Sequence, residues 1–375
     1  MTFEDFNFND QVLDGLQSMG YITPTPIQEQ TIPIIMQKKD LIACAQTGTG
    51  KTAAFVLPLL HNLTSTAPRA EKAIRCLIIG PTRELAIQID QQIEGFSYFC
   101  PVSATCIYGG NDSQLWEKQK TALTTGAEIV IGTPGRLMAH MNFNYVDLQH
   151  VECLILDEAD RMLEMGFIDD ILKIITFLPK DRQTLMFSAT MPSKIRTLAR
   201  TIQNHPVQID IAVSKPNDNI TQAVYMAEER QKNEIIKSLL AGKTMENAII
   251  FTSTKRTAKE LEKELSQIGF AVKSIHSDLE QKEREDALRE FKNGRLQMLV
   301  ATDILSRGID INALSLVINY DVPHDPEDYI HRIGRTARAD NNGVALTFVN
   351  RKDMQKFERI EKFLGKTIYR VPYTK

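Results

Sequence analysis

The chain has 375 residues, of which 43% are hydrophobic and 24% charged, and its formal net charge is −3. This length fits about two domains of ordinary size, and no apolar stretch reaches the roughly 20 residues that a membrane span needs. A polar start with Glu4 and Asp5 argues against a secretory signal. We therefore expect a cytoplasmic protein. Because its net charge provides no global positive field, we expect it to bind any polyanion through local groups.

The cysteine and histidine patterns indicate neither a disulfide framework nor a protein-only metal centre. The five cysteines all lie in the first half and form no C-x-x-C pair. Three of them stand in apolar stretches typical of strands, so we expect small core residues. The seven histidines show no H-E-x-x-H or other clustered ligand pattern. Mg²⁺ carried with a nucleotide is the only metal that we expect.

The first half alternates short β-like stretches with helical ones. Strands are predicted at residues 40–44, 76–79, 104–108, 128–131, 151–156, 183–187 and 207–211. Apolar strands of this kind are buried on both faces, and helical crossovers between them indicate a parallel α/β sheet.

A glycine-rich loop stands between the first predicted strand and a helix that begins near Thr52. Gly48 and Gly50 let backbone N–H groups turn around an anion, Lys51 reaches the β- and γ-phosphates, and the Thr52 hydroxyl can ligate Mg²⁺. The first glycine of the general G-x-x-x-x-G-K-[ST] pattern is absent. We interpret this stretch as a phosphate site with an irregular first position, formed by Ala45, Gln46, Thr47, Gly48, Thr49, Gly50, Lys51 and Thr52.

Two further Gly-Lys-Thr triplets, at residues 242–244 and 365–367, lack the rest of this pattern. Lys237 and Ile360 occupy the position of the first glycine, and each triplet follows a helical stretch rather than a strand. We interpret both triplets as turns at helix C-termini, where glycine is common.

An acidic cluster follows the strand predicted at 151–156. Ligands of a parallel α/β sheet collect at the carboxyl ends of its strands, and Asp157, Glu158 and Asp160 fall at such an end. One acid there can hold Mg²⁺ while its neighbour positions or deprotonates the attacking water. We assign the first role to Asp157 and the second to Glu158. Without the glycine-rich loop, an exposed acidic turn would be the better interpretation.

The periodicity stops around residues 211–219, where polar and turn-forming residues take over. We place the domain boundary there, between a first domain at 1–211 and a second at 218–375. Strands of the second domain are predicted at 248–251, 271–275, 297–301, 314–319 and 344–349, with amphipathic helices at 255–268 and 281–292. The expected fold class is α/β, with two tandem parallel-sheet domains joined by a short linker.

A basic stretch lies in the second domain at residues 331–338. On a helix, Arg335 and Arg338 would share one face, so that both guanidinium groups could meet a γ-phosphate presented by the first domain. Such arginines contribute on the order of 10³–10⁵ in rate in P-loop enzymes. In isolation a solvated basic face would be the better interpretation, and only the other motifs favour catalysis.

Together these motifs resemble those of the DEAD-box RNA helicases, from Phe3 to about Val349. The resemblance implies two RecA-like domains, the ATP-binding domain first, that couple ATP binding and hydrolysis to local unwinding or remodelling of RNA duplexes and RNA–protein complexes. It also accounts for Ala45, which fits the family pattern A-x-T-G-x-G-K-T. Residues 20–28 resemble the family's Q motif, in which Gln28 would bond the adenine while Phe3 and Tyr21 stack.

The resemblance also assigns roles to loops that follow predicted strands. Contacts to the RNA backbone are implied for Pro81, Thr82, Arg83, Gly109, Gly110, Thr133, Arg136, Arg284 and Thr302. Coupling of hydrolysis to strand separation is implied for Asp160, Ser188, Thr190 and His331. Asp310 would face the ribose, and Arg335 and Arg338 would be arginine fingers. Ser277, Ala337 and Asp340 replace glycines of the family pattern, and Asp340 brings a negative charge near those arginines.

We hypothesise that two domains, mobile when empty, close over ATP and single-stranded RNA and bend the bound strand, so that short duplexes open. One alternative is an ATP-gated RNA clamp or assembly scaffold with little unwinding, and another is a DNA translocase with the same two-domain engine. Expected partners are single-stranded and duplex RNA, bound with little sequence specificity by a monomer that needs no membrane. Since no basic or glycine-rich extension follows the second domain, we expect modest, salt-sensitive RNA binding.

Overall fold

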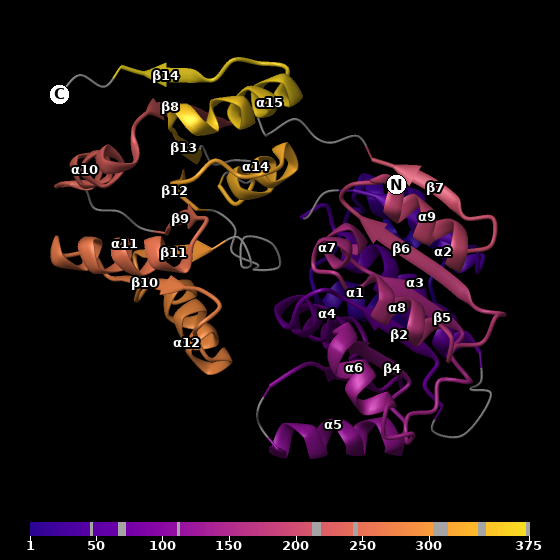
Figure 1. The fold of residues 1–375 in the computed structure, drawn as a ribbon. Helices are drawn as coiled ribbons and strands as arrows, with labels where there is room; N and C mark the ends of the chain where they lie inside the picture. The colour runs from indigo at the N-terminus through magenta and orange to yellow at the C-terminus, as the bar shows by residue number, and fades with distance from the viewer. Residues whose placement is uncertain are drawn as a thin grey trace. The chain divides into compact units, whose positions relative to one another are not determined.

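The computed structural model describes residues 1–45, 48–66, 73–110, 113–211, 219–242, 247–302, 314–336 and 343–372. The chain divides into two compact units, Met1–Val213 and Ser214–Lys375. Each unit is built on one sheet of parallel strands with helices on both faces (Figure 1). The predicted α/β class, with two parallel-sheet domains, is confirmed.

The first unit alternates strands and helices along most of its length. Its strands are β1 (Leu41–Cys44), β2 (Cys76–Ile79), β3 (Ala104–Ile107), β4 (Ile129–Gly132), β5 (Cys153–Leu156), β6 (Gln183–Ser188) and β7 (Val207–Asp210). Its helices are η1 (Phe3–Phe6), α1 (Asp10–Ser18), α2 (Pro26–Met36), α3 (Lys51–Ser65), α4 (Arg83–Phe96), α5 (Ser113–Thr125), α6 (Pro134–Met141), α7 (Ala159–Glu164), α8 (Ile168–Ile175) and α9 (Ser193–Ile202).

The first sheet has the strand order β3-β4-β2-β5-β6-β1-β7, and all of its neighbouring strands are parallel. Each of these strands was predicted from its apolar stretch. Successive residues of a strand face opposite sides: Leu41 and Ala43 join the core under α1 to α4, whereas Ile42 joins the core under α5 to α9. Burial on both faces explains why central strands such as β2 and β5 lack polar alternation, whereas the edge strand β7 alternates apolar and polar residues.

The second unit repeats this architecture. Its strands are β8 (Ile220–Met226), β9 (Ala248–Thr252), β10 (Val272–Ile275), β11 (Met298–Thr302), β12 (Leu316–Asn319), β13 (Gly343–Val349) and β14 (Tyr369–Val371). Its helices are α10 (Glu229–Leu240), α11 (Lys255–Gln267), α12 (Gln281–Lys292), α14 (Pro326–Ile333), η2 (Arg351–Asp353) and α15 (Met354–Leu364).

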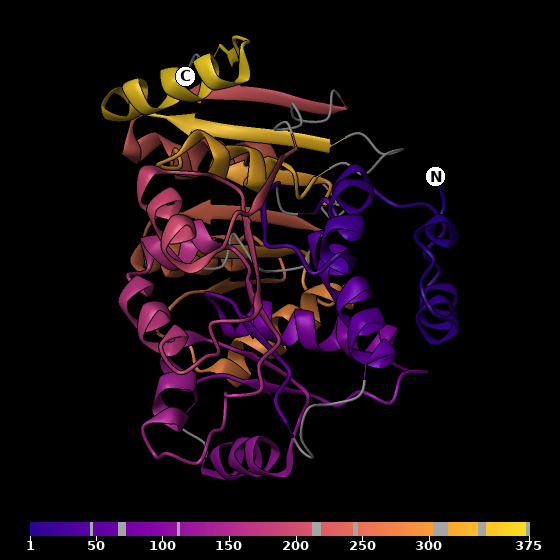
Figure 2. The ribbon, with the colours of Figure 1, turned by 90° about the vertical axis from the view of Figure 1, so that its right-hand side faces the viewer.

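The second sheet has the order β10-β11-β9-β12-β13-β8-β14, again with parallel neighbours. Figure 2 shows its strands, coloured salmon to yellow, lying one above another. Helices α10 and α11 cover one face, and α12, α14 and α15 cover the other. Sequence reasoning missed β8 and β14, because Thr221 and Gln222 interrupt the apolar run of β8 and β14 is a three-residue edge strand.

Several smaller expectations are settled by the local backbone. Gly365 caps α15 with φ 67°, and Gly242 follows α10 with φ 70°, so both glycines lie at helix C-terminal turns as predicted; Lys243 and Thr244 lie outside the described residues. The five cysteines are free and are buried or half-buried. Within the described ranges, no helix has the length and apolar character to cross a membrane.

Helix α1 is fixed to α4 by a close backbone approach. A Cβ atom at Gly15 would lie 2.2 Å from the carbonyl oxygen of Phe96. The Phe96 ring in turn meets Tyr21 edge to face, with ring centroids 5.1 Å apart. The glycine therefore sets where the N-terminal segment, which carries Tyr21, lies on the first unit.

We predict that Gly15→Ala destabilises the protein although alanine is the better helix former. The helix-propensity gain is up to ~1 kcal/mol, whereas overpacking against a rigid carbonyl costs about 1–3 kcal/mol. Urea unfolding followed by circular dichroism should show a lower midpoint. Gly95→Ala is the matched control on α4, because its Cβ would meet the flexible end of Met19, with Sδ 2.6 Å away, which can move aside. Equal midpoints for Gly15→Ala and the unsubstituted protein would contradict this account of the contact.

Candidate functional site

The carboxyl edge of the first sheet gathers two groups of loops. Strands β5, β6 and β1 are neighbours, and so are β3, β4 and β2. The residues expected to act on a nucleotide follow the first three strands, and those expected to contact RNA follow the other three. Because all of these strands are parallel, their carboxyl ends lie at one edge of the sheet.

The glycine-rich loop follows β1 and ends at the start of α3. Gly48 and Gly50 have φ of 82° and 89°, the left-handed region that glycine adopts without strain. Ala45 N donates to Ser188 O at 3.0 Å, which ties the start of the loop to β6. Gln46 and Thr47 lie outside the described residues. The loop therefore delivers the N-terminus of α3, with its free backbone N–H groups, to the sheet edge.

Lys51 begins α3 and is 7% exposed. Its Nζ atom is buried and has no hydrogen-bond partner among the described residues. Thr52 follows it in the first turn of α3 and is half-buried. A buried ammonium group without a partner costs several kcal/mol, so the surroundings of Lys51 suit an anionic ligand.

Asp157 and Glu158 follow β5 and are both buried. Burial raises the pKa of Asp157 to about 6, the positive charge of Lys51 opposes this rise, and the charge of Glu158 adds to it. The Asp157 Oδ1 accepts a hydrogen bond from Glu158 N at 2.9 Å. Glu158 itself has φ 53°, which is strained for a residue other than glycine. Strain of this kind gathers at sites where function fixes a side chain.

Asp160 joins the loops after β5 and β6. Its Oδ2 accepts from both the backbone N and the hydroxyl of Thr190, at 2.9 and 3.0 Å. Its own N donates to Ser188 Oγ at 3.2 Å, and that hydroxyl donates to Thr190 O at 2.8 Å. The structure thus brings together three of the residues predicted to couple hydrolysis to strand separation.

Gln28 is buried beside the glycine-rich loop. Its Oε1 accepts from Thr25 N at 2.8 Å, and its Nε2 donates to Gly50 O at 3.1 Å. The Thr25 hydroxyl donates to Thr49 O at 2.8 Å. An amide has capacity for further bonds, so adenine recognition by Gln28 stays a prediction. Thr25 was missed, although its T-x-x-Q spacing to Gln28 is a capping-box signal.

The two aromatic residues predicted to stack on the adenine differ in exposure. Phe3 is buried, in contact with Phe6 and with the edge of Tyr21 at centroid distances of 6.1 and 6.3 Å. Tyr21 is only half-buried. Tyr21 is therefore the better placed of the two to meet a ligand, with Phe3 behind it.

The loop after β2 contains Pro81, Thr82 and Arg83. The first two are buried, and the Thr82 side chain caps α4 by accepting from Leu85 N at 3.3 Å. Arg83 lies over the Tyr108 ring at 4.2 Å and donates from Nη1 to Gly109 O at 3.2 Å. Arg83 and the glycine pair after β3 are thus neighbours, as expected of one backbone-binding surface.

The loop after β4 brings Thr133 and Arg136 to the same part of the edge. Thr133 is the N-cap residue of α6. Arg136, in the first turn of α6, donates from Nε to Gln119 Oε1 at 2.9 Å and lies over the Trp116 ring at 4.5 Å. Its Nη2 is buried without a hydrogen-bond partner among the described residues. Gln119 and Trp116 carry no motif and were not predicted.

The second unit places two of its predicted residues at the carboxyl edge of its own sheet. Thr302 ends β11, and its hydroxyl is buried without a hydrogen-bond partner in the described part of the chain. Arg284 on α12 donates from Nη2 to Ser277 O at 3.0 Å. Asp310 and Arg338 lie outside the described residues.

The prediction that Arg335 lies on a helix is wrong. Helix α14 ends at Ile333, with Gly334 as its C-cap. Thr336 is buried and forms a bridge with Leu314, to whose O its hydroxyl donates at 2.5 Å. Pairing with a neighbouring strand region therefore replaces helical hydrogen bonding after Gly334. Arg335 itself is half-buried and lies in the turn between them.

His331 and Arg332 lie on α14 and are buried. Arg332 donates from Nη1 to Asn319 Oδ1 and Asp321 O, at 3.2 and 3.1 Å, and its guanidinium lies 5.2 Å from the Phe251 ring centroid. Arg332 was not predicted as a site residue. It fixes α14 to the ends of β9 and β12, next to the turn that carries Arg335.

The oxygen donors of the first unit fit Mg²⁺ held together with a nucleotide. The described residues contain no group of three or more His, Cys, Asp or Glu that could hold a metal ion alone. The Thr52 hydroxyl and the Asp157 carboxylate are oxygen donors, and Mg²⁺ usually takes one or two such ligands together with phosphate oxygens and water. The unpartnered Nζ of Lys51 suits the phosphates of the same ligand.

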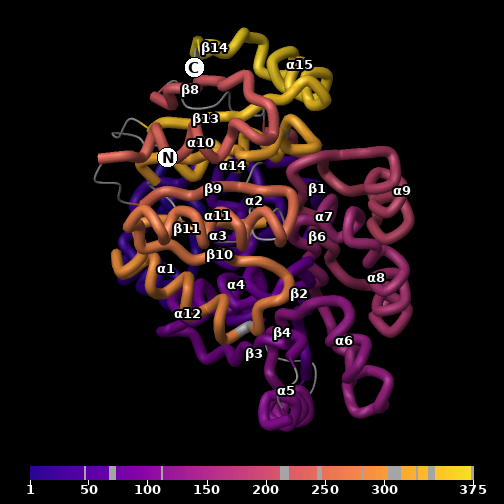
Figure 3. Tube along the Cα trace, turned by 60° about the vertical axis from the view of Figure 1, so that its left-hand side comes forward, coloured from indigo at the N-terminus to yellow at the C-terminus, as the bar shows by residue number. Residues whose placement is uncertain are grey.

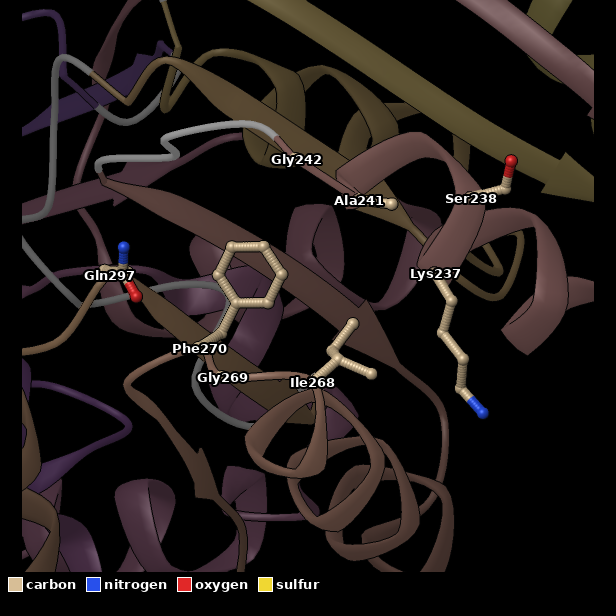
Figure 4. A pocket seen from close by; sticks show the side chains of 8 residues that line it. All are labelled: Lys237, Ser238, Ala241, Gly242, Ile268, Gly269, Phe270 and Gln297. Atoms are coloured by element: carbon tan, nitrogen blue, oxygen red, sulfur yellow. The ribbon is translucent and has the colours of Figure 1, made fainter.

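One pocket in the second unit lies away from this chemistry. It has a volume of about 610 Å³ and is found where β9, β10 and β11 begin, beside the C-termini of α10 and α11 (Figure 4). The residues that line it include Lys237, Ala241, Gly242, Ile268, Phe270 and Gln297. Since Thr302 lies at the opposite end of β11, this pocket belongs to the other edge of the sheet.

Two family models match the chain. Residues 25–198 match the DEAD/DEAH box helicase model, and residues 231–340 match the helicase conserved C-terminal domain. The chain is 43% identical to the ATP-dependent RNA helicase CshA of Listeria monocytogenes, over 96% of this chain and 68% of that protein. It is 42% identical to the DEAD-box ATP-dependent RNA helicase CshA of Geobacillus kaustophilus, over 96% of this chain and 76% of that protein.

Solved structures give the same result. Saccharomyces cerevisiae Dbp5 bound to RNA and ADP BeF3 matches with a TM-score of 0.87 and 32% identity, covering 99% of this chain and 95% of that one. A DEAD box protein from Methanococcus jannaschii matches with a TM-score of 0.56 and 39% identity, covering 99% of both chains. The chain therefore belongs to the DEAD-box family of ATP-dependent RNA helicases.

Proposed function

We propose that residues 1–211 form the ATP-binding domain of this RNA helicase and residues 218–375 its C-terminal helicase domain. The observation that supports the nucleotide site best is the buried Nζ of Lys51, which lacks a hydrogen-bond partner among the described residues and lies close enough to Asp157 to lower the pKa of its carboxyl group. ATP is the substrate, and Mg²⁺ is the expected cofactor.

Different residues of the first unit are assigned to phosphate binding, Mg²⁺ binding and activation of water. Lys51 and the amides of the glycine-rich loop bind the β- and γ-phosphates. Thr52 and Asp157 would hold Mg²⁺, which supplies charge stabilisation to the phosphate oxygens when bound. Glu158, buried next to Asp157, orients the attacking water and accepts its proton. Gln28, which is bonded to Gly50 O, and Tyr21 would face the base.

Asp160, Ser188 and Thr190 form the proposed link between hydrolysis and RNA. Their hydrogen bonds join the loop that carries Glu158 to the loop after β6. A change in the loop around Glu158 therefore moves the partners of Thr190 as well. His331 on α14 is the corresponding proposal in the second unit.

RNA is proposed to lie along the loops after β2, β3 and β4 and after β11. Arg83 and Arg136 offer guanidinium groups, Gly109 and Gly110 leave backbone amides accessible, and Thr302 offers a buried hydroxyl. Contacts of this kind address phosphate and sugar, so they carry little sequence information. The relative Dbp5, which has this fold, is bound to RNA in its solved structure.

We also propose a cytoplasmic location and a monomeric working form. ATP and RNA are both present in the cytoplasm, and one chain carries all of the residues proposed for the two substrates. Measurement of the sedimentation coefficient with and without RNA checks the second point.

Strand separation tests the proposed function against an RNA clamp. With ATP in excess and a trap for released strands, the chain should separate a short RNA duplex. Retention of RNA without separation would favour the clamp. A DNA duplex of the same sequence is the matched control, because only RNA carries the 2′-OH. Equal separation of the DNA duplex would instead favour a DNA translocase.

The substitution Lys51→Ala should lower RNA-stimulated ATP hydrolysis by on the order of 10²–10³, the usual loss when one preorganised donor to a developing charge is removed. Steady-state phosphate release measures this. Lys366→Ala is the matched control, since Lys366 follows the C-cap glycine of α15 in the same Gly-Lys-Thr tripeptide. If Lys51→Ala keeps near-normal turnover, the phosphate site is assigned to the wrong loop.

The substitution Arg335→Ala should leave ATP binding intact and lower hydrolysis by on the order of 10³–10⁵, as expected for an arginine that stabilises charge only in the transition state. Fluorescent nucleotide titration gives the affinity, and single-turnover hydrolysis gives the rate. Arg351→Ala is the control, because Arg351 is 92% exposed on the same unit. If ATP affinity and the rate of hydrolysis fall equally, Arg335 does not act as an arginine finger.

A further inference from the structure

Helices α5 and α6 of the first unit meet through a cluster of aromatic and polar side chains. The two helices lie side by side in Figures 1 and 3, and Trp116 of α5 stacks on His140 of α6, with ring centroids 3.9 Å apart and an interplanar angle of 15°. Tyr145, which follows α6, hydrogen-bonds His140 Nδ1 through its hydroxyl. None of these residues belongs to a motif of the family.

Gln119 is the member of this cluster that reaches the RNA loops. It is 3% exposed. Its Nε2 donates to Tyr108 O at 3.1 Å, at the start of the loop that contains Gly109 and Gly110. Its Oε1 accepts from Arg136 Nε at 2.9 Å. One buried amide therefore joins the loop after β3 to the arginine after β4.

The same connection extends to the loop after β2. Arg83 lies over the Tyr108 ring and donates to Gly109 O. Contacts therefore run from Gln119 to Tyr108 and from Tyr108 to Arg83. These contacts hold together three loops that follow neighbouring strands. Motions that change the spacing of these loops would have to break the bonds of the Gln119 amide.

The hydrogen bonds also fix the orientation of the His140 ring. Because Gln119 Nε2 donates to Tyr108 O, its Oε1 is the acceptor for His140 Nε2, 3.1 Å away. His140 Nε2 therefore donates to this oxygen, and Nδ1 hydrogen-bonds the Tyr145 hydroxyl, which can donate or accept. The two bonds together hold the plane of the imidazole ring against Gln119.

The surroundings of His140 keep it neutral. Burial lowers its pKa to about 4, and the positive charge of Arg136 contributes. The other charged groups near the pair are Glu117 and Lys120 on α5, which act on Tyr145. Since the folded pKa lies below the ordinary value of 6.5, the stability from neutral His140 is complete above pH 6.5 and is lost as the pH falls towards 4.

The contacts of Arg136 fix the direction of its guanidinium donors. With Nε bonded to Gln119 and the guanidinium plane resting on Trp116, the Nη groups are the part left for a ligand. Nη2 is buried and has no hydrogen-bond partner among the described residues. A guanidinium held in this way presents its donors in a fixed direction, which suits a phosphate oxygen.

We propose that Gln119, oriented by His140, is a positioning residue that holds Arg136 and the loop at Gly109 and Gly110 in the geometry that binds the RNA backbone. The inference rests on the proposed contact of Arg136 with RNA. Trp116 supports the guanidinium from below. Because the arginine is already held before RNA arrives, RNA binding costs less side-chain entropy. Loss of Gln119 should therefore lower RNA affinity rather than turnover.

A double-mutant cycle tests this inference. Gln119→Leu keeps the size of the side chain but removes the hydrogen bonds to Tyr108, Arg136 and His140, and it should raise the RNA concentration for half-maximal ATPase stimulation about tenfold, or ~1.4 kcal/mol. Turnover at saturating RNA and the KM for ATP should stay close to those of the unsubstituted chain. Arg136→Ala should raise the same RNA concentration, and the double variant should add little to it, because both substitutions remove one interaction.

The possible results separate the inference from the proposed function. If Gln119→Leu leaves the half-saturating RNA concentration unchanged while Arg136→Ala raises it, Gln119 has no positioning role. Additive effects in the double variant also overturn the inference. If Arg136→Ala itself has no effect, the RNA contact is wrong and the inference fails with it. Should Gln119→Leu not fold, Tyr145→Phe, which frees His140 Nδ1, must give a smaller rise in the same quantity.

The single tryptophan of the chain provides a direct readout. Trp116 contacts both His140 and Arg136, so engagement of Arg136 by RNA changes the charge beside the indole ring. Titration with single-stranded RNA should alter Trp116 fluorescence with the same midpoint as ATPase stimulation. The change should vanish in Arg136→Ala. An unchanged signal in the unsubstituted protein at saturating RNA would show that the cluster does not respond to RNA.

Discussion

The ammonium group of Lys51 is buried at the carboxyl edge of a parallel sheet, close enough to the buried Asp157 to influence its pKa. A buried charge without hydrogen bonds is costly, and this one has no hydrogen-bond partner among the described residues, which suits an anionic ligand. Several other features of the first unit position this lysine and its loop. Strands β5, β6 and β1 lie side by side, left-handed Gly50 starts α3, and Gln28 fastens the loop by its bond to Gly50 O.

The same sheet edge holds the loops proposed for nucleotide chemistry and the loops proposed for nucleic-acid binding. Asp160 bonds Thr190 across the ends of β5 and β6, while Gln119 bonds the loops after β3 and β4. Both are buried polar links between loops that contain proposed functional residues, and both depend on the parallel order of the strands. Buried polar links of this kind fix geometry because each broken bond leaves an unsatisfied group. The loops proposed to bind RNA and those proposed to act on ATP are therefore both joined by buried hydrogen bonds.

The sequence predicted the elements whose signals are local. The central strands of the first sheet, such as β2 and β5, are apolar because helices cover both faces, and the glycine-rich loop has a fixed spacing. Prediction failed where distant residues decide the outcome. Arg335 lies in a turn because Thr336 pairs with Leu314, and β14 is a short edge strand that exists because it pairs with β8. Gln119 and His140 carry no motif, and only the packing of α5 on α6 gives them a role.

The central claim is that a chain with this buried lysine and these backbone-binding loops hydrolyses ATP in response to RNA. The most direct measurement is steady-state phosphate release with Mg²⁺ and saturating ATP, across a titration of single-stranded RNA of several unrelated sequences. The account predicts low turnover without RNA and a saturable rise that differs little among sequences and weakens with salt. Turnover that is the same with and without every RNA would contradict it.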